Sequence, residues 1–214
     1  QITKVKYFRD KTKFDLIIKN FNGKKKTVTN IFVNLIGNHN VQNATAAISI
    51  CLNLGIKINI IKKALSNFTG VQRRMTKIFT YNSNEFFDDY AHHPTEIRSV
   101  LDGVREVYKK KEIVCIFQPH RISRLKNLKA EFAKSFKKAN TIILCPLYKA
   151  GESIKLGFSY KSFAKLIAKD SNVNLITIKN ELELKKVTNN LAFGNKIFIA
   201  MGAGSISNWV RNLN

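Results

Sequence analysis

The chain is poor in acidic residues, in cysteine and in long apolar runs. Its 214 residues hold 14 Asp and Glu against 37 Lys and Arg, which gives a formal net charge of +23. No apolar run approaches the ~20 residues that a membrane-spanning helix needs, so we predict no membrane partner. The sequence also lacks Gly-x-x-x-x-Gly-Lys-[Ser/Thr], the loop that cradles nucleotide phosphates.

Only three cysteines are present, and none has a partner at the spacing of metal ligands. Cys51, Cys115 and Cys145 stand alone in apolar runs. We interpret them as buried small hydrophobic residues, as expected in a reducing cytoplasm, and we predict no metal-binding residue among them.

The excess of basic residues makes a nucleic-acid-binding domain one interpretation. The lysines are, however, spread along the chain, in loops such as Lys24-Lys25-Lys26 and Lys109-Lys110-Lys111. No zinc-finger spacing, aromatic RNA-binding strand or Arg-rich helix accompanies them. We therefore predict no nucleic-acid partner and interpret the charge as solvated surface whose field favours anionic ligands.

The order of predicted elements indicates an α/β protein. An early hairpin, Phe14 to Lys19 and Thr27 to Val33 with a turn at Asn22-Gly23, is followed by helices at Val41 to Leu54 and Ile58 to Leu65. Phe68 to Arg74 forms a linker. Strands then alternate with helices near 95–110, 125–138, 159–169 and 181–192, which favours a mostly parallel, doubly wound sheet. The predicted strands are Met75 to Tyr81, Glu85 to Asp89, Ile113 to Phe117, Thr141 to Cys145, Asn174 to Ile178 and Lys196 to Ala200.

Chemistry-bearing side chains crowd the junction Asp88-Asp89-Tyr90-Ala91-His92-His93-Pro94-Thr95-Glu96. The junction follows a short strand and precedes an amphipathic helix that runs from Thr95 to Lys110, with Pro94 suited to the first helical position. Ligands of α/β proteins bind at this edge of the sheet. The alternative is a capped loop whose polar groups satisfy the backbone.

A second polar cluster, Gln118-Pro119-His120-Arg121-Ile122-Ser123-Arg124, follows the strand Ile113 to Phe117 and precedes a helix from about Leu125 to Lys138. Arg121 and Arg124 lie three residues apart and are candidates to hold one carboxylate or phosphate. An arginine at a helix N-terminus opposes the helix dipole, which disfavours a purely structural role. We expect this turn to face the Asp88–Pro94 turn across the ends of adjacent strands.

A third cluster opens the helix that ends before Gly55. In Gly37-Asn38-His39-Asn40-Val41-Gln42-Asn43-Ala44, the amides of Asn40 and Asn43 lie one turn apart and are able to recognise the edge of a base. The alternative is that Asn40 is only an N-cap. Gly202-Ala203-Gly204 after the last strand suits either close approach to a ligand or a tight turn.

Six segments, in order and in register from about residue 14 to the end, resemble the Mur ligase family. They are the three clusters above together with Phe68-Thr69-Gly70-Val71-Gln72-Arg73-Arg74, Tyr148-Lys149-Ala150-Gly151-Glu152 and Gly202-Ala203-Gly204-Ser205. The Gln118-Pro119-His120-Arg121 stretch favours the branch that adds L-alanine to UDP-N-acetylmuramate over the branch that recycles murein tripeptide.

The resemblance implies a three-domain enzyme of which this chain is a C-terminal fragment. Residues 1–74 would be the end of a central ATP-binding α/β domain, and 75–214 a Rossmann-like C-terminal domain with a mostly parallel sheet flanked by helices. The phosphate loop and the main Mg²⁺ ligands would lie upstream, so the chain is expected to be inactive without its own missing N-terminal domains.

The resemblance also implies an ATP-dependent ligation through an acyl phosphate, with ADP and phosphate released. It associates Arg74, Asp89, His39, Asn40 and Asn43 with ATP. It associates Tyr90, His92, Arg121 and Arg124 with the muramoyl carboxylate and the incoming alanine, and Arg74, Asp89 and His92 with catalysis. A non-catalytic nucleotide-binding module is the remaining alternative.

Overall fold

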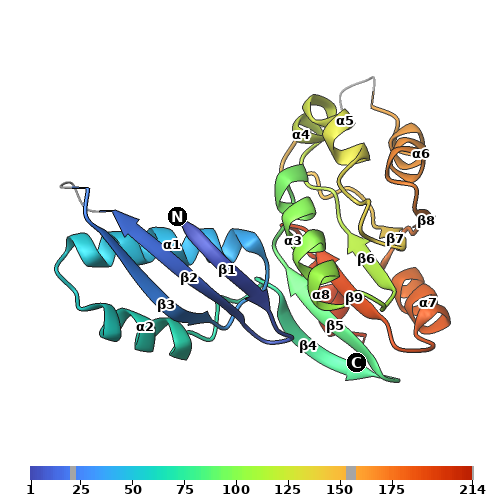
Figure 1. Ribbon diagram of the computed structural model, residues 1–214. Helices are drawn as coiled ribbons and strands as arrows, with labels where there is room; N and C mark the ends of the chain where they lie inside the picture. The colour runs from blue at the N-terminus through green and yellow to red at the C-terminus, as the bar shows by residue number, and fades with distance from the viewer. Residues whose placement is uncertain (20–22, 153–157, 214) are drawn as a thin grey trace. The chain divides into compact units, whose positions relative to one another are not determined.

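The computed structural model describes residues 1–19, 23–152 and 158–213, and the chain divides into two compact units (Figure 1). Unit 1 comprises residues 1–71 with 102–109, and unit 2 comprises residues 72–101 with residues from 110 onward. Helix α3, Pro94–Val107, therefore contributes to both. The domain boundary at residues 74 and 75 stays a prediction.

Unit 1 is a small antiparallel sheet with two helices. Strands β1 (Ile2–Tyr7), β2 (Thr12–Lys19) and β3 (Lys25–Val33) pair in that order, and α1 (Asn38–Asn53) and α2 (Ile58–Asn67) follow. The predicted pairing of β2 with β3 is confirmed, whereas strand β1 was not predicted from the sequence. Asn22 of the predicted turn lies outside the described residues.

Unit 2 contains a six-stranded sheet in the order β4-β5-β9-β6-β7-β8. Only β4 is antiparallel to its neighbour; the other pairs are parallel, which confirms the predicted α/β class. The strands are β4 (Thr76–Tyr81), β5 (Asn84–Asp89), β6 (Ile113–Phe117), β7 (Thr141–Leu144), β8 (Asn174–Thr177) and β9 (Ile197–Met201). The later helices are α6 (Tyr160–Ser171), α7 (Glu181–Leu191) and α8 (Ile206–Arg211).

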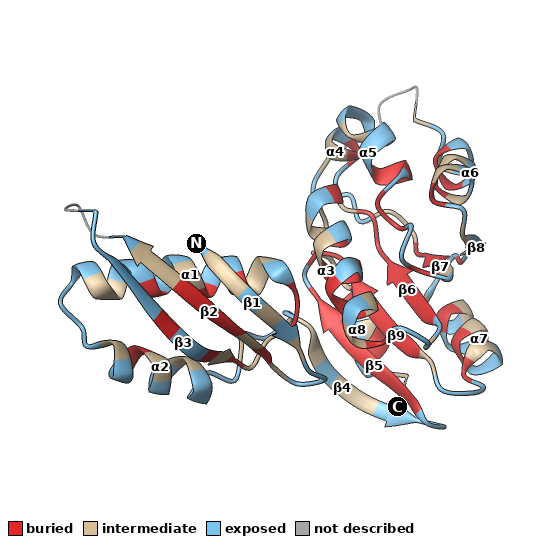
Figure 2. Ribbon diagram, viewed as in Figure 1, coloured by how far each residue is buried: buried red, intermediate tan, exposed pale blue. Residues whose placement is uncertain are grey.

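The central strands of this sheet are buried on both faces, as an apolar parallel sheet requires, whereas the edge strands β4 and β8 are partly exposed. All residues of β5, β6 and β9 are buried (Figure 2). On one face, Phe86 and Phe198 stack at 4.5 Å and belong to a cluster with residues of α7 and α8. On the other, Phe117 lies 5.2 Å from Phe136. The sheet is thus a buried layer that carries polar turns at its carboxyl edge.

One predicted helix, Leu125 to Lys138, is wrong. Two short helices replace it, α4 (Ile122–Asn127) and α5 (Lys129–Ala133), because Leu128 between them leaves the helical region at φ −114° and ψ 25°. Phe132 and Phe136 are nevertheless fully buried. The apolar spacing is therefore satisfied by two helices as well as by one. No helix among the described residues is long and apolar enough to cross a membrane.

Candidate functional site

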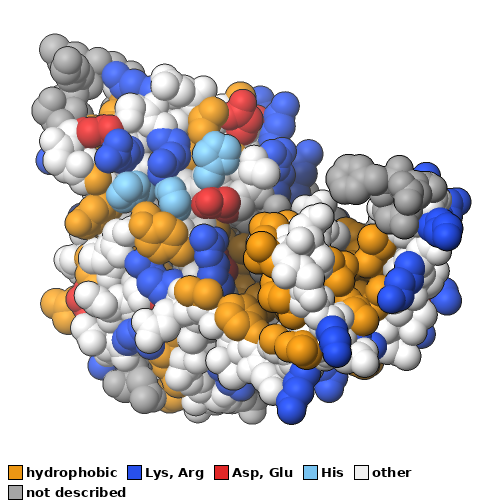
Figure 3. Space-filling view, turned by 90° about the vertical axis from the view of Figure 1, so that its left-hand side faces the viewer, with side chains coloured by type: hydrophobic (Ala, Val, Ile, Leu, Met, Phe, Trp, Pro, Cys, Tyr) orange, Lys and Arg blue, Asp and Glu red, His pale blue; other side chains and the backbone are white. Residues whose placement is uncertain are grey.

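The candidate site lies in unit 2, at the carboxyl edge of the parallel strands. The strands that carry the two main polar turns, β5 and β6, are not adjacent as expected, because β9 pairs with both. The turns still meet beyond the strand ends, where the rings of His92 and His120 lie 5.7 Å apart at 77°. Figure 3 shows histidine side chains gathered with basic and acidic ones on one face.

His92 is held by contacts within its own turn. Its Nδ1 lies 2.9 Å from the carbonyl oxygen of Tyr90 and 3.4 Å from Oε2 of Glu96. Both neighbours accept hydrogen bonds, so Nδ1 carries the proton and, in the neutral ring, Nε2 keeps its lone pair. The arrangement leaves Nε2 as the one atom of His92 able to accept a proton.

Glu96 caps the start of α3. Its Oε2 accepts hydrogen bonds from the backbone N–H groups of His92, at 2.9 Å, and His93, at 3.1 Å. Burial opposes its ionisation, but these two amides and the charges of His92 and Arg74 lower the pKa of Glu96 below its usual value. Pro94 begins the helix as predicted.

His120 links the second turn to the segment after β7. Its ring stacks on Tyr148, with centroids 5.6 Å apart at 12°, and its Nδ1 lies 3.4 Å from Nη1 of Arg124. Burial lowers the pKa of His120, and the charge of His92 lowers it further. The guanidinium groups of Arg124 and Arg121 act in the same direction. A neutral imidazole beside two arginines is therefore favoured.

The sequence predicts Arg121 and Arg124 in a turn just before a long helix, whereas the structure places them at the start of the short helix α4 and within it. Arg121 occupies the N-cap position of α4 with φ 67° and ψ 125°, and Arg124 already lies in the last turn of this six-residue helix. The argument from an opposing helix dipole therefore fails for Arg124, whereas Arg121 does stand at a helix N-terminus. Arg121 is exposed and Arg124 half-buried, so the guanidinium of Arg121 is open to solvent.

The two aspartates at the end of β5 differ in their surroundings. Asp89 accepts hydrogen bonds from the backbone N–H groups of Met75, at 2.9 Å, and Ala91, at 2.8 Å. Burial raises the pKa of Asp89 to about 6, against the effect of these amides. Asp88 is fully buried and lies 3.2 Å from Nη2 of Arg211. Asp89 thus fastens the 73–75 segment to the strand end.

The adjacent residues Arg73 and Arg74 differ in exposure: Arg73 points inward and Arg74 outward. Arg73 lies over the ring of Tyr90 at 4.8 Å, donates to the carbonyl of Gly202 and faces Asp88 with its Nε 3.6 Å from Oδ1. Arg74 is exposed, and its charge acts on Asp89. Arg73 therefore orients Tyr90, while Arg74 presents its guanidinium to solvent.

The glycines after β9 are required by packing. A Cβ on Gly202, whose φ is 148°, would lie 2.8 Å from the carbonyl oxygen of Gln118. The buried Gln118 side chain accepts from the N–H of Ile206 and donates to Ser205 Oγ, both at 3.1 Å. The tight-turn interpretation of this segment therefore has a physical basis in the structure.

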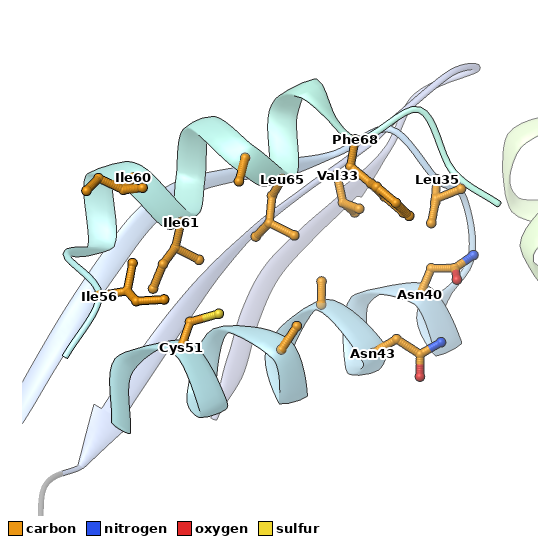
Figure 4. Close-up of a pocket in the computed structure, with 13 residues that line it drawn as sticks. Val33, Leu35, Asn40, Asn43, Cys51, Ile56, Ile60, Ile61, Leu65 and Phe68 are labelled. Atoms are coloured by element: carbon orange, nitrogen blue, oxygen red, sulfur yellow. The ribbon is translucent and has the colours of Figure 1, made fainter. Parts of the chain in front are cut away.

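A separate apolar groove of about 430 Å³ lies within unit 1, between α1, α2 and the end of β3. Figure 4 shows Asn40 and Asn43 at one end of it. Asn40 is not the N-cap of α1: the cap is Gly37, and the Asn40 amide donates to the Ile36 carbonyl at 2.8 Å. Asn43 is exposed, and His39 is half-buried.

Three residues important to this geometry were not singled out from the sequence. Asp88, Gln118 and Glu152 stand inside the quoted motifs, but their partners are far away in the chain. Cys51 is half-buried rather than buried. Among the described residues, no group of three or more His, Cys, Asp or Glu side chains is arranged to hold a metal ion.

Comparison with known proteins identifies relatives of the whole chain. The model of the family "Mur ligase, glutamate ligase domain" matches residues 73–204. The UDP-N-acetylmuramate–L-alanine ligase of Pelagibacter ubique is 55% identical over 99% of this chain and 46% of the relative. That of Vesicomyosocius okutanii is 41% identical over 82% of this chain and 38% of its own length. The chain thus spans about half the length of the curated relatives it matches, or less.

A solved structure agrees. The UDP-N-acetylmuramate-alanine ligase of Thermotoga maritima superposes with a TM-score of 0.79 at 29% identity, covering 99% of this chain and 44% of that protein.

Proposed function

Because the chain belongs to the Mur ligase family, we propose that it forms part of an ATP-dependent ligase that joins L-alanine to UDP-N-acetylmuramate in the bacterial cytoplasm. The observation that carries this proposal is the meeting of His92, His120 and Arg124 beyond two non-adjacent strand ends. The names of the relatives, 55% and 41% identical to this chain, support the choice of substrates.

The proposed reaction has two steps. ATP phosphorylates the muramoyl carboxylate, and the amine of alanine then attacks the acyl carbon. A C–N bond forms, the C–O bond to phosphate breaks, and the amine gives up a proton. Such a site must neutralise developing negative charge and hold the amine in line with the carbonyl.

Arg124 and Arg121 are assigned to the carboxylate of alanine. A guanidinium group binds a carboxylate through two parallel hydrogen bonds, which fixes its direction as well as its position. Arg124 lies 3.4 Å from Nδ1 of the His120 ring, and the lowered pKa of His120 favours a neutral ring that does not repel the guanidinium. Tyr90, held under Arg73, lines the same region.

His92 is assigned to the amine. Its Nδ1 is engaged with the Tyr90 carbonyl, so Nε2 is the atom able to accept the proton that the amine loses. Glu96, 3.4 Å from Nδ1, stabilises the imidazolium that results. His92 therefore orients the amine and takes its proton, which leaves the nitrogen lone pair free to attack.

Residues in each unit are assigned to ATP. In unit 1 these are His39, Asn40 and Asn43, of which the exposed Asn43 amide offers both a donor and an acceptor to a base edge. In unit 2 they are Arg74 and Asp89. A magnesium ion accompanies ATP in this reaction class, and among the described residues no group of three or more His, Cys, Asp or Glu side chains is arranged to hold it.

The proposed clamp on the alanine carboxylate, formed by Arg121 and Arg124, is tested in a full-length ligase that includes these residues. Arg124→Ala removes a charge-assisted bond of about 1.5–3 kcal/mol, so the KM for alanine should rise roughly 10- to 150-fold while that for ATP stays constant. Arg124→Lys should recover only part of the loss. Lys126→Ala, an exposed basic residue on the same helix, is the control.

Steady-state kinetics with alanine and ATP varied separately decide the matter. An unchanged KM for alanine in both Arg124 variants would contradict the clamp. The same assay with murein tripeptide in place of alanine separates this function from that of a recycling ligase, which would prefer the tripeptide.

A further inference from the structure

The turn that carries the two arginines is held by backbone hydrogen bonds to the segment that follows β7. The N–H of Arg121 donates to the carbonyl of Tyr148 at 3.1 Å, and the N–H of Tyr148 donates to the carbonyl of Pro119 at 2.9 Å. His120 and Tyr148 form an isolated parallel bridge and stack their rings. Contacts with Tyr148, a residue distant in the chain, therefore fix the position of the turn that carries Arg121 and Arg124.

Helix α4 begins without a capping side chain of its own. Its N-cap residue, Arg121, makes no side-chain cap hydrogen bond and adopts a left-handed φ of 67°, which residues other than glycine rarely occupy. The first N–H groups of a helix need partners from elsewhere. A strained backbone of this kind persists only when its surroundings hold it.

Glu152 supplies the missing partner. Its Oε2 accepts the backbone N–H of Ser123 at 3.0 Å, and its Oε1 accepts the Ser123 hydroxyl at 2.6 Å. The bonds from Ser123 lower the pKa of Glu152, so this carboxylate is ionised at neutral pH. Ser123 lies between Arg121 and Arg124 in the chain, so the carboxylate fastens the backbone between the two guanidinium groups.

We propose that Glu152 is a positioning residue for the amino-acid substrate, an inference that rests on the proposed function of the arginines. It acts by holding the Arg121–Arg124 turn in its left-handed start, and it acts through the arginines rather than by touching the substrate. A purely structural role would lower the stability of the segment without changing recognition of one substrate.

The test uses a full-length ligase that includes these residues. Glu152→Ala should raise the KM for alanine roughly five- to tenfold, the effect of losing a hydrogen-bonded partner. The KM for ATP and the kcat at saturating alanine should stay within about twofold. The variant weakens the binding of alanine by the same amount in the ground state and in the transition state, which raises KM and leaves kcat unchanged. Ser123→Ala, which deletes one of the two bonds, should fall between wild type and Glu152→Ala.

Rescue and a matched control separate positioning from stability. Glu152→Gln keeps an oxygen for the Ser123 N–H, so its KM for alanine should lie near that of wild type. Glu183→Ala removes a comparable carboxylate, which accepts the Lys179 N–H at 2.8 Å near the start of α7. It should lower the melting temperature but leave the KM for alanine unchanged. If Glu152→Ala does not fold, Ser123→Ala carries the test.

A double variant separates the positioning role of Glu152 from the binding role of Arg124. In an Arg124→Ala background, Glu152→Ala should raise the KM for alanine by much less than it does alone, because it acts through that arginine. If Arg124→Ala raises the KM and Glu152→Ala and Ser123→Ala do not, this inference is wrong and the proposed clamp stands. If Arg124→Ala is silent, the clamp and this inference both fail. Equal rises in the KM for alanine and for ATP would also overturn the positioning role.

Discussion

Removing the charge of Asp88 should destabilise unit 2, because that buried carboxylate binds side chains from segments that are distant in the chain. It is fully buried, accepts the Ser207 hydroxyl at 2.5 Å and lies 3.2 Å from Nη2 of Arg211. On its other side, Nε of Arg73 lies 3.6 Å away. The network thus joins the 72–75 segment, the end of β5 and helix α8.

The magnitude follows from what Asp88→Asn leaves behind. Breaking a fully buried ion pair costs about 3–5 kcal/mol, since the remaining charge has no partner. The side chains of Arg73 and Arg211 are 24% and 43% exposed, so water compensates part of that loss. We therefore expect a loss of about 2–3 kcal/mol, or a fall in the melting temperature of roughly 5–10 °C for a chain of this size.

Urea and thermal denaturation of residues 1–214, followed by circular dichroism, measure this effect. Asp102→Asn, which removes the same charge from an exposed position on α3, is the control and should change stability by less than about 0.5 kcal/mol. The reasoning is refuted if Asp88→Asn is as mild as this control. A loss above about 5 kcal/mol would mean that water does not reach the two arginines.

Three further predictions concern nucleotide binding, pH and packing. Asn43→Ala in a full-length ligase should weaken ATP binding by roughly 1–3 kcal/mol, measured by calorimetric titration, with the KM for alanine unaltered; an unchanged ATP affinity removes Asn43 from the site. The pKa of Asp89 is raised to about 6, so the folded state binds more protons than the unfolded state between about pH 4 and 6. Its contribution to stability is therefore present below pH 4 and is lost as the pH rises through 6, by up to about 3 kcal/mol. The difference in unfolding free energy between wild type and Asp89→Asn should follow this slope, and a difference independent of pH would contradict it. Gly202→Ala should lower the melting temperature measurably, because its Cβ would lie 2.8 Å from the Gln118 carbonyl oxygen; a melting temperature equal to that of wild type would contradict this packing argument.

Local sequence patterns determined most of the elements of unit 2. The run Ile113–Phe117 is a strand with the predicted bounds, and Pro94 starts α3 where its fixed φ and missing N–H allow it. The same kind of reasoning failed at 125–138. Apolar spacing reports which residues are buried, such as Phe132, and does not reveal where the backbone leaves the helix, as it does at Leu128.

The sequence by itself also determined which residues gather at the strand ends, since polar turns after parallel strands share one edge of the sheet. Only the tertiary structure decided how they meet. The last strand, β9, lies between β5 and β6, and His92 still approaches His120. Likewise, Ser123 and Glu152 are 29 residues apart, and Asp88 and Ser207 are 119 apart. Local propensity and periodicity act over a few residues, whereas strand order and the pairing of buried charges depend on which distant segments the fold brings into contact.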